Sequence, residues 1–89
     1  MNVSYIAHIS GTVQGVYFRA SAQQQAIELG LSGYICNLAD GNVEVLICGE
    51  QINIDTMLVW LAHGPEKAKV IDIQYKKIAL QEHSFFSIS

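Results

Sequence analysis

Apolar residues change their spacing along the chain in an order that restricts the possible folds. Two segments repeat apolar residues at helical spacing: Ala22, Ala26 and Leu29 in the first, and Ile54, Met57, Leu58 and Leu61 in the second. Gly30 and Gly64-Pro65 are stop signals for these helices. Strand-like runs cover residues 3–10, 31–38, 42–48, 68–76 and 85–88. This order predicts an α+β ferredoxin-like fold (βαββαβ), a two-layer sandwich whose antiparallel sheet carries two helices on one face.

Asp40-Gly41, between the second and third runs, is a strong hairpin signal. A two-residue turn there predicts that Cys36 lies across from Val45. Cys48 then falls three residues further along, on the opposite face of the sheet. We therefore expect no disulfide between the two cysteines.

Length and charge exclude several classes of protein. A chain of 89 residues predicts a single domain, residues 1–89, with one two-layer core. The formal net charge of -3 argues against a nucleic-acid partner, which needs many basic contacts to phosphate. The N-terminus lacks the features of a signal peptide, and no apolar run reaches membrane-spanning length. We expect a cytoplasmic monomer with no membrane partner, whose two cysteines are thiols in a reducing compartment.

The stretch GTVQGVYFR, residues 11–19, contains the only arginine of the chain, Arg19. Gly11 and Gly15 bracket a turn between the first strand and the first helix, and residues 1–27 contain no acidic side chain. Free N–H groups and the dipole at a helix N-terminus favour an anion, and a guanidinium adds a two-pronged grip on phosphate oxygens. One interpretation is an anion site, and the other is an ordinary turn followed by a solvated arginine.

Asn37 stands near the end of the second strand, in the stretch GYICNLADGNVEV. Its amide carries both a donor and an acceptor, which suits the holding of a water molecule. Asparagine also precedes turns for purely local reasons, so this residue alone decides nothing.

GTVQGVYFR resembles the signature loop of the acylphosphatase family. The second stretch resembles that family's Gly-aromatic-x-x-Asn-x-x-x-Gly-x-Val motif through Gly33, Tyr34, Asn37, Gly41 and Val43. Gly49 and the segment from Gly64-Pro65 to Ala68 and Val70 also fit the family, so the resemblance covers essentially the whole chain. Cys36, the bulky Ile35 and the final FFSIS depart from the family pattern, which leaves rate and substrate preference open.

The resemblance implies hydrolysis of a small-molecule acyl phosphate, a carboxyl-phosphate mixed anhydride, to a carboxylate and inorganic phosphate. It implies that Arg19 binds the phosphoryl group and that Asn37 positions the attacking water. Inorganic phosphate or sulfate is the expected ligand of the site. The main-chain amides that would complete the phosphate cradle are those of Val13, Gln14, Gly15, Val16, Tyr17 and Phe18.

No metal or cofactor motif accompanies these residues, and we expect neither. His8, His63 and His83 are scattered and are read as structural. A site without metal or obvious general acid suits a leaving group that departs unaided, and a carboxylate does so because its conjugate acid has a pKa near 4. Two alternatives from other classes stay open: a non-catalytic anion- or ligand-binding module on the same fold, and an RNA-binding domain suggested faintly by the aromatic run GVYF.

Overall fold

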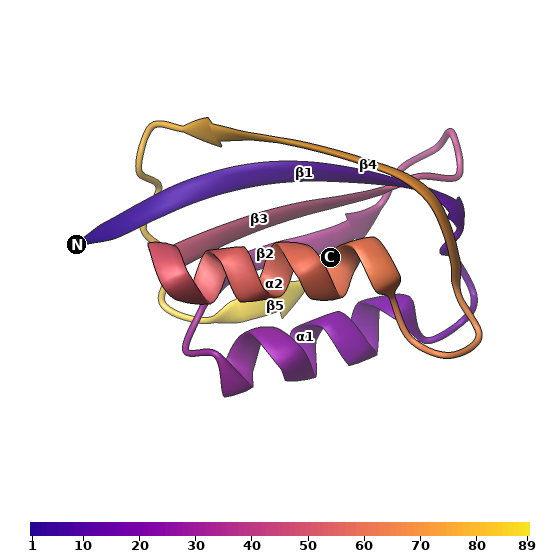
Figure 1. Cartoon of the computed structure of the whole chain (residues 1–89), viewed down its shortest axis with the longest axis horizontal. Coiled ribbons are helices and arrows are strands. Elements are labelled where there is room, and N and C mark those ends of the chain that lie inside the picture. Colours follow the sequence, from indigo (N-terminus) through magenta and orange to yellow (C-terminus); the bar gives the residue numbers. More distant parts are fainter.

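The computed structural model describes residues 1–89, which form one five-stranded sheet and two helices (Figure 1). The elements are β1 (Asn2–Thr12), α1 (Phe18–Glu28), β2 (Ser32–Asn37), β3 (Val43–Glu50), α2 (Gln51–His63), β4 (Lys69–Ile78) and β5 (Phe86–Ile88). Their order agrees with the order predicted from the sequence. Neither helix is long and apolar enough to cross a membrane.

The strands lie in the order β4-β1-β3-β2-β5, and both helices cover the same face of the sheet (Figure 1). This arrangement confirms the ferredoxin-like prediction. The first four strands pair antiparallel, whereas β5 pairs with β2 in parallel, so the complete sheet is mixed.

The core fills the space between the helices and one face of the sheet. Alternate residues of the strands point into it, as the period of a half-buried strand requires. The apolar stripes predicted for the two helices also pack into this core. Its members include Ala7 and Ile9 of β1, Val43, Val45 and Ile47 of β3, Ala22 and Ala26 of α1, and Ile54, Met57, Leu58 and Leu61 of α2.

The first strand continues beyond the predicted end at residue 10. A bulge shifts the register of the β1–β4 pair between Ser10 and Gly11, after which Thr12 still pairs with Lys69. The first helix likewise begins at Phe18, four residues before the first predicted apolar position, Ala22. The connection between β1 and α1 is therefore only residues 13–17, which restricts the shapes that it can adopt.

The predicted register of the β2–β3 hairpin is wrong. Asn37 pairs with Val43 and Cys36 with Glu44, so residues 38–42 form the connection in place of a two-residue turn. The Leu38 N–H donates to the Asn42 carbonyl, and the Asn42 N–H donates to Asp40 Oδ1. A two-residue turn at Asp40-Gly41 would lose these bonds.

This register also moves the cysteines. Cys36 and Cys48 lie on the same face of the sheet, not on opposite faces, because Cys48 is an even number of residues from Glu44. Both thiols are free, as predicted. The separation of four residues along the sheet, about 13 Å at the rise of a strand, keeps them too far apart for a disulfide.

Replacement of Gly33 by alanine should strongly destabilise the fold. Gly33 has φ 134°, and an added Cβ would lie 1.9 Å from the Leu46 carbonyl oxygen of the paired strand. Gly41→Ala is the matched control, since its φ is also positive (92°) but its Cβ would meet nothing. We expect Gly33→Ala to cost more than about 2 kcal/mol and Gly41→Ala about 1 kcal/mol in urea unfolding. Equal losses would show that the close strand approach is not what requires Gly33.

Candidate functional site

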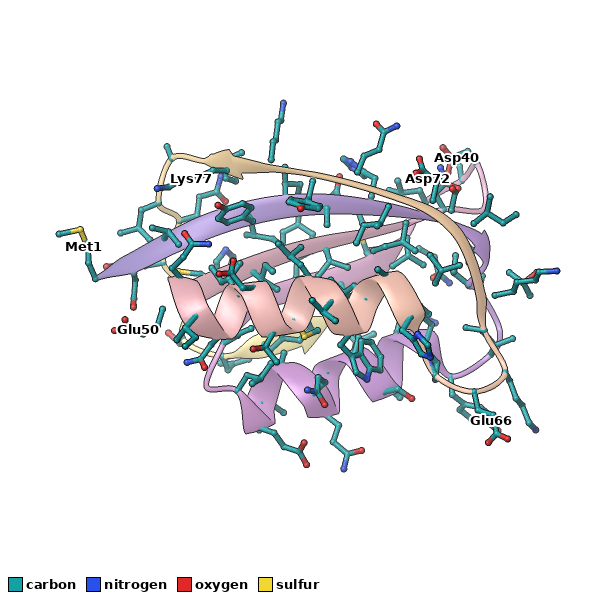
Figure 2. The ribbon with its side chains drawn as sticks, viewed as in Figure 1. Met1, Asp40, Glu50, Glu66, Asp72 and Lys77 are labelled. Atoms are coloured by element: carbon teal, nitrogen blue, oxygen red, sulfur yellow. The ribbon has the colours of Figure 1, made fainter.

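The β1–α1 connection and the β2–β3 connection lie at the same end of the molecule. Figure 1 shows β1 ending there, and Figure 2 marks the tip of the β2–β3 connection with Asp40. The antiparallel pairing of β1 with β3 explains why the two connections lie together, because Ile9 near the end of β1 lies opposite Val43 at the start of β3. The two stretches singled out in the sequence are thus brought to one end of the sheet.

Residues 13–17 leave β1 in an unusual backbone conformation. Gly15 has φ 72°, and Tyr17 is the only residue other than glycine with a positive φ (60°). Tyr17 occupies the N-cap position of α1, yet no side chain caps that helix and its first turn holds no acidic residue. Left-handed tyrosine is costly and N-caps normally take Ser, Thr, Asp or Asn, so the conformation is not explained by helix stability.

The main-chain N–H groups of this connection are available to a ligand. None of the hydrogen bonds within the chain uses an N–H of residues 13–17 as donor. The dipole of the 11-residue helix α1 adds a positive potential at the same place. The combination of free N–H groups, an uncapped helix start and no nearby acid is a favourable environment for an anion.

Arg19 lies in the first turn of α1 and is held toward the edge of the sheet. It is half-buried, and its Nη1 donates to the main-chain oxygen of Ser89 at 3.1 Å. The Ser89 N–H in turn donates to the Ile35 carbonyl of β2 at 2.9 Å. Arg19 forms no ion pair with an Asp or Glu side chain.

A surface hollow lies beside the guanidinium. It is lined by Val13, Gly15 and Tyr17 of the connection, Phe18, Arg19 and Ala20 of α1, and Ile88 of β5. Phe18 is buried and packs against Trp60 of α2 with ring centroids 5.9 Å apart, which anchors the start of α1 to the core. Arg19 is the only charged residue among those that line the hollow.

Gln14 connects the two stretches directly. Its Nε2 donates to the carbonyl oxygens of Leu38 and Asn42, each at 2.9 Å, and so holds the β2–β3 connection against the β1–α1 connection. Val16 packs against the core from the same turn. Asn37, the last residue of β2, comes immediately before Leu38 and is exposed, but it does not line the hollow.

Cys36, next to Asn37, is not suited to act as a nucleophile. Burial raises the pKa of its thiol, the Glu44 carboxylate raises it further, and the positive charge of Arg19 opposes them. The thiol is therefore protonated at neutral pH.

His8, Tyr34 and Glu44 form a titratable cluster on the face of the sheet opposite the helices. Glu44 accepts from Tyr34 Oη at 2.8 Å and lies 2.8 Å from His8 Nε2. The hydrogen bonds from His8 and Tyr34 lower the pKa of the Glu44 carboxyl, and burial, with this carboxylate, raises the pKa of Tyr34 to about 12. No histidine lines the hollow beside Arg19, and no three His, Cys, Asp or Glu residues are grouped to hold a metal ion.

Three contributions to this end of the molecule were not predicted from the sequence. They are the side chain of Gln14 as a link, Ile88 as part of the hollow, and the main chain of Ser89 as the partner of Arg19. The glutamine belonged to a recognised motif, although nothing in it indicated a reach to Leu38. The run 85–88 was predicted as a strand, but its sequence did not indicate the parallel pairing with β2 that brings the tail beside Arg19.

The comparisons with known proteins agree with this fold. The family model for acylphosphatase matches residues 5–88. An acylphosphatase of Colwellia psychrerythraea is 74% identical over 88 residues, which are 99% of each chain. The structure of an acylphosphatase from Coxiella burnetii has a TM-score of 0.96 at 36% identity and covers 99% of this chain and 93% of that one. The acylphosphatase from Bacillus subtilis has a TM-score of 0.94 at 33% identity, covering 100% and 99%. The chain belongs to the acylphosphatase family, and its activity is the hydrolysis of acyl phosphates.

Proposed function

We propose that this chain hydrolyses acyl phosphates by direct attack of water on a phosphoryl group held between Arg19 and the main-chain amides of residues 13–18. The observation that carries the proposal is the run of main-chain N–H groups, residues 13–17, that have no acceptor in the chain. They precede Arg19, a cation that forms no ion pair with an Asp or Glu side chain. We further propose a monomer in a reducing compartment such as the cytoplasm, which suits two free thiols.

Charge stabilisation is the main task of such a site. In phosphoryl transfer the negative charge is spread over three oxygens of the transferring group, and catalysis depends on positioning and electrostatics. The guanidinium can grip two of these oxygens, and the loop amides can donate to the remaining lone pairs. Inorganic phosphate, the product, and sulfate present the same oxygens and are the expected ligands of the resting site.

Asn37 is proposed to hold the attacking water. Its amide has no usable pKa, so it orients the water and does not deprotonate it. Gln14 is proposed to position Asn37 by holding the adjacent Leu38 against the phosphate loop. The phosphoryl group and the water would then keep a fixed separation, although they are held by different segments of the chain.

The leaving group explains why so few side chains suffice. A carboxylate is a weak base, with a conjugate-acid pKa near 4, and can depart without a proton donor. The mechanism therefore needs neither a histidine acid nor a metal ion. Alkyl phosphate esters, whose leaving groups are far more basic, should be poor substrates.

The direct test is phosphate release from acetyl phosphate and benzoyl phosphate in the presence of EDTA. We expect full activity after exhaustive chelation, and added magnesium should at most compete by binding the substrate. Loss of activity in EDTA that zinc or magnesium restores would overturn the proposed mechanism.

Arg19→Ala should lower kcat/KM about a thousandfold or more and weaken phosphate binding, because the guanidinium contacts the phosphoryl oxygens before and during reaction. Arg19→Lys should recover little, since an ammonium cannot reproduce the two-pronged contact. Far-UV circular dichroism checks the fold of both variants. A lysine variant with near-parental kcat/KM would argue against bidentate binding.

Asn37→Ala should lower kcat about a hundredfold or more while the Kd for inorganic phosphate stays close to that of the parent. Gln14→Met, which keeps the length of the side chain but removes both hydrogen bonds, should also lower kcat. If Gln14 acts through Asn37, the double variant should be little slower than Asn37→Ala alone.

Titration with phosphate and steady-state kinetics on the four proteins complete this cycle. Strictly additive losses would show that Gln14 and Asn37 act independently. Retention of turnover by Asn37→Ala would require another residue to position the water.

A further inference from the structure

We propose that the hollow beside Arg19 is the subsite for the acyl group and that Tyr17 and Ile88 make it selective for apolar, above all aromatic, acyl phosphates. This inference rests on the function proposed above, because it assigns the part of the same site that receives the leaving group.

The composition of the hollow supports an apolar occupant. Apart from Arg19 and Gly15, the residues that line it are apolar or aromatic: Val13, Tyr17, Phe18, Ala20 and Ile88. Val13 and Phe18 are almost completely buried, whereas Tyr17 is 77% and Ile88 is 41% exposed. Ala20 is also exposed but small, so Tyr17 and Ile88 supply most of the apolar surface that a ligand bound at Arg19 can cover.

The backbone around Tyr17 gives a second reason. Tyr17 adopts a left-handed conformation that glycine or asparagine would adopt at lower cost, and its side chain does not cap the helix. Its ring is not part of the core. A large aromatic side chain kept at such a position, at the edge of a ligand site, is explained by contact with a ligand.

The in-line geometry of water attack on phosphorus would place the acyl group in the hollow. In an in-line reaction the water and the leaving carboxylate lie on opposite sides of phosphorus. Asn37, the proposed partner of the water, does not line the hollow. The bond between phosphorus and the acyl oxygen would then point toward Tyr17 and Ile88, where an aromatic ring can pack edge-to-face or offset against tyrosine.

Charge sets the other limit of selectivity. Arg19 is the only charged residue that lines the hollow, and its guanidinium is used by the phosphoryl group. An acyl group that carries a carboxylate or a second phosphate would enter an apolar subsite with no cation left to pair with it. Neutral apolar acyl groups should be preferred over these charged ones.

The experiment compares kcat/KM for acetyl, benzoyl and 4-carboxybenzoyl phosphate, the last two differing by one carboxylate. Tyr17→Asn removes the ring in a residue that tolerates the left-handed backbone, Ile88→Ser removes the second wall, and Tyr17→Phe keeps the ring. Ile52→Ser, an exposed apolar residue of α2 away from the hollow, is the matched control.

We expect the parent to prefer benzoyl over 4-carboxybenzoyl phosphate. The ratio of kcat/KM for benzoyl to acetyl phosphate should fall about tenfold in Tyr17→Asn, as for loss of one well-packed aromatic contact, and less in Ile88→Ser. Tyr17→Phe and Ile52→Ser should keep the parental ratio. Benzoyl and acetyl phosphate use the same phosphate loop, so general damage to that loop would not change the ratio of their kcat/KM values.

Binding of phenylphosphonate and methylphosphonate, measured by calorimetry, gives a readout without turnover. A preference for phenylphosphonate that is lost in Tyr17→Asn would support the subsite, whether or not acyl phosphates are hydrolysed. Absence of hydrolysis would count against the proposed mechanism alone. If acyl phosphates are hydrolysed but the ratios stay the same in both Tyr17→Asn and Ile88→Ser, the subsite is wrong and the proposed mechanism stands.

Discussion

Pairing of β1 on both of its edges is the constraint on which the site depends. This strand pairs with β3 along residues 2–9 and with β4 along residues 4–12, so both of its edges are held in the sheet. β1 continues past the bulge at Ser10 and Gly11 to Thr12, so the loop before α1 begins directly at the end of a paired strand. Because β3 is fixed to the same strand, the β2–β3 connection is fixed beside that loop as well.

The phosphate loop is held by contacts outside itself. Phe18 anchors the start of α1 in the core, and the Gln14 side chain anchors the turn to the β2–β3 connection. These contacts offset the cost of the left-handed Tyr17 and of N–H groups left without acceptors. A loop whose conformation is determined by its surroundings can keep its donors free for a ligand.

The edge of the sheet completes this arrangement. β5 is short, yet its pairing with β2 places Ile88 beside Arg19 and lets Ser89 bridge the guanidinium to Ile35. The guanidinium is thereby oriented by a main-chain oxygen and not by an Asp or Glu side chain.

Local periodicity and turn chemistry were enough to predict the fold class, the two helical stripes, and the position of Arg19 where a strand is followed by a helix. The motif resemblance also identified the family before any geometry was available. Packing between distant segments sets the hairpin register, the shared face of Cys36 and Cys48, the reach of Gln14 to Leu38 and Asn42, and the place of Ile88 in the hollow. The contacts of Gln14 and of Ile88 each join segments at least 24 residues apart in the chain, and the Gln14 hydrogen bonds stabilise the hairpin register. Such contacts are selected by the packing of whole elements against one another, so no local pattern of residues encodes them.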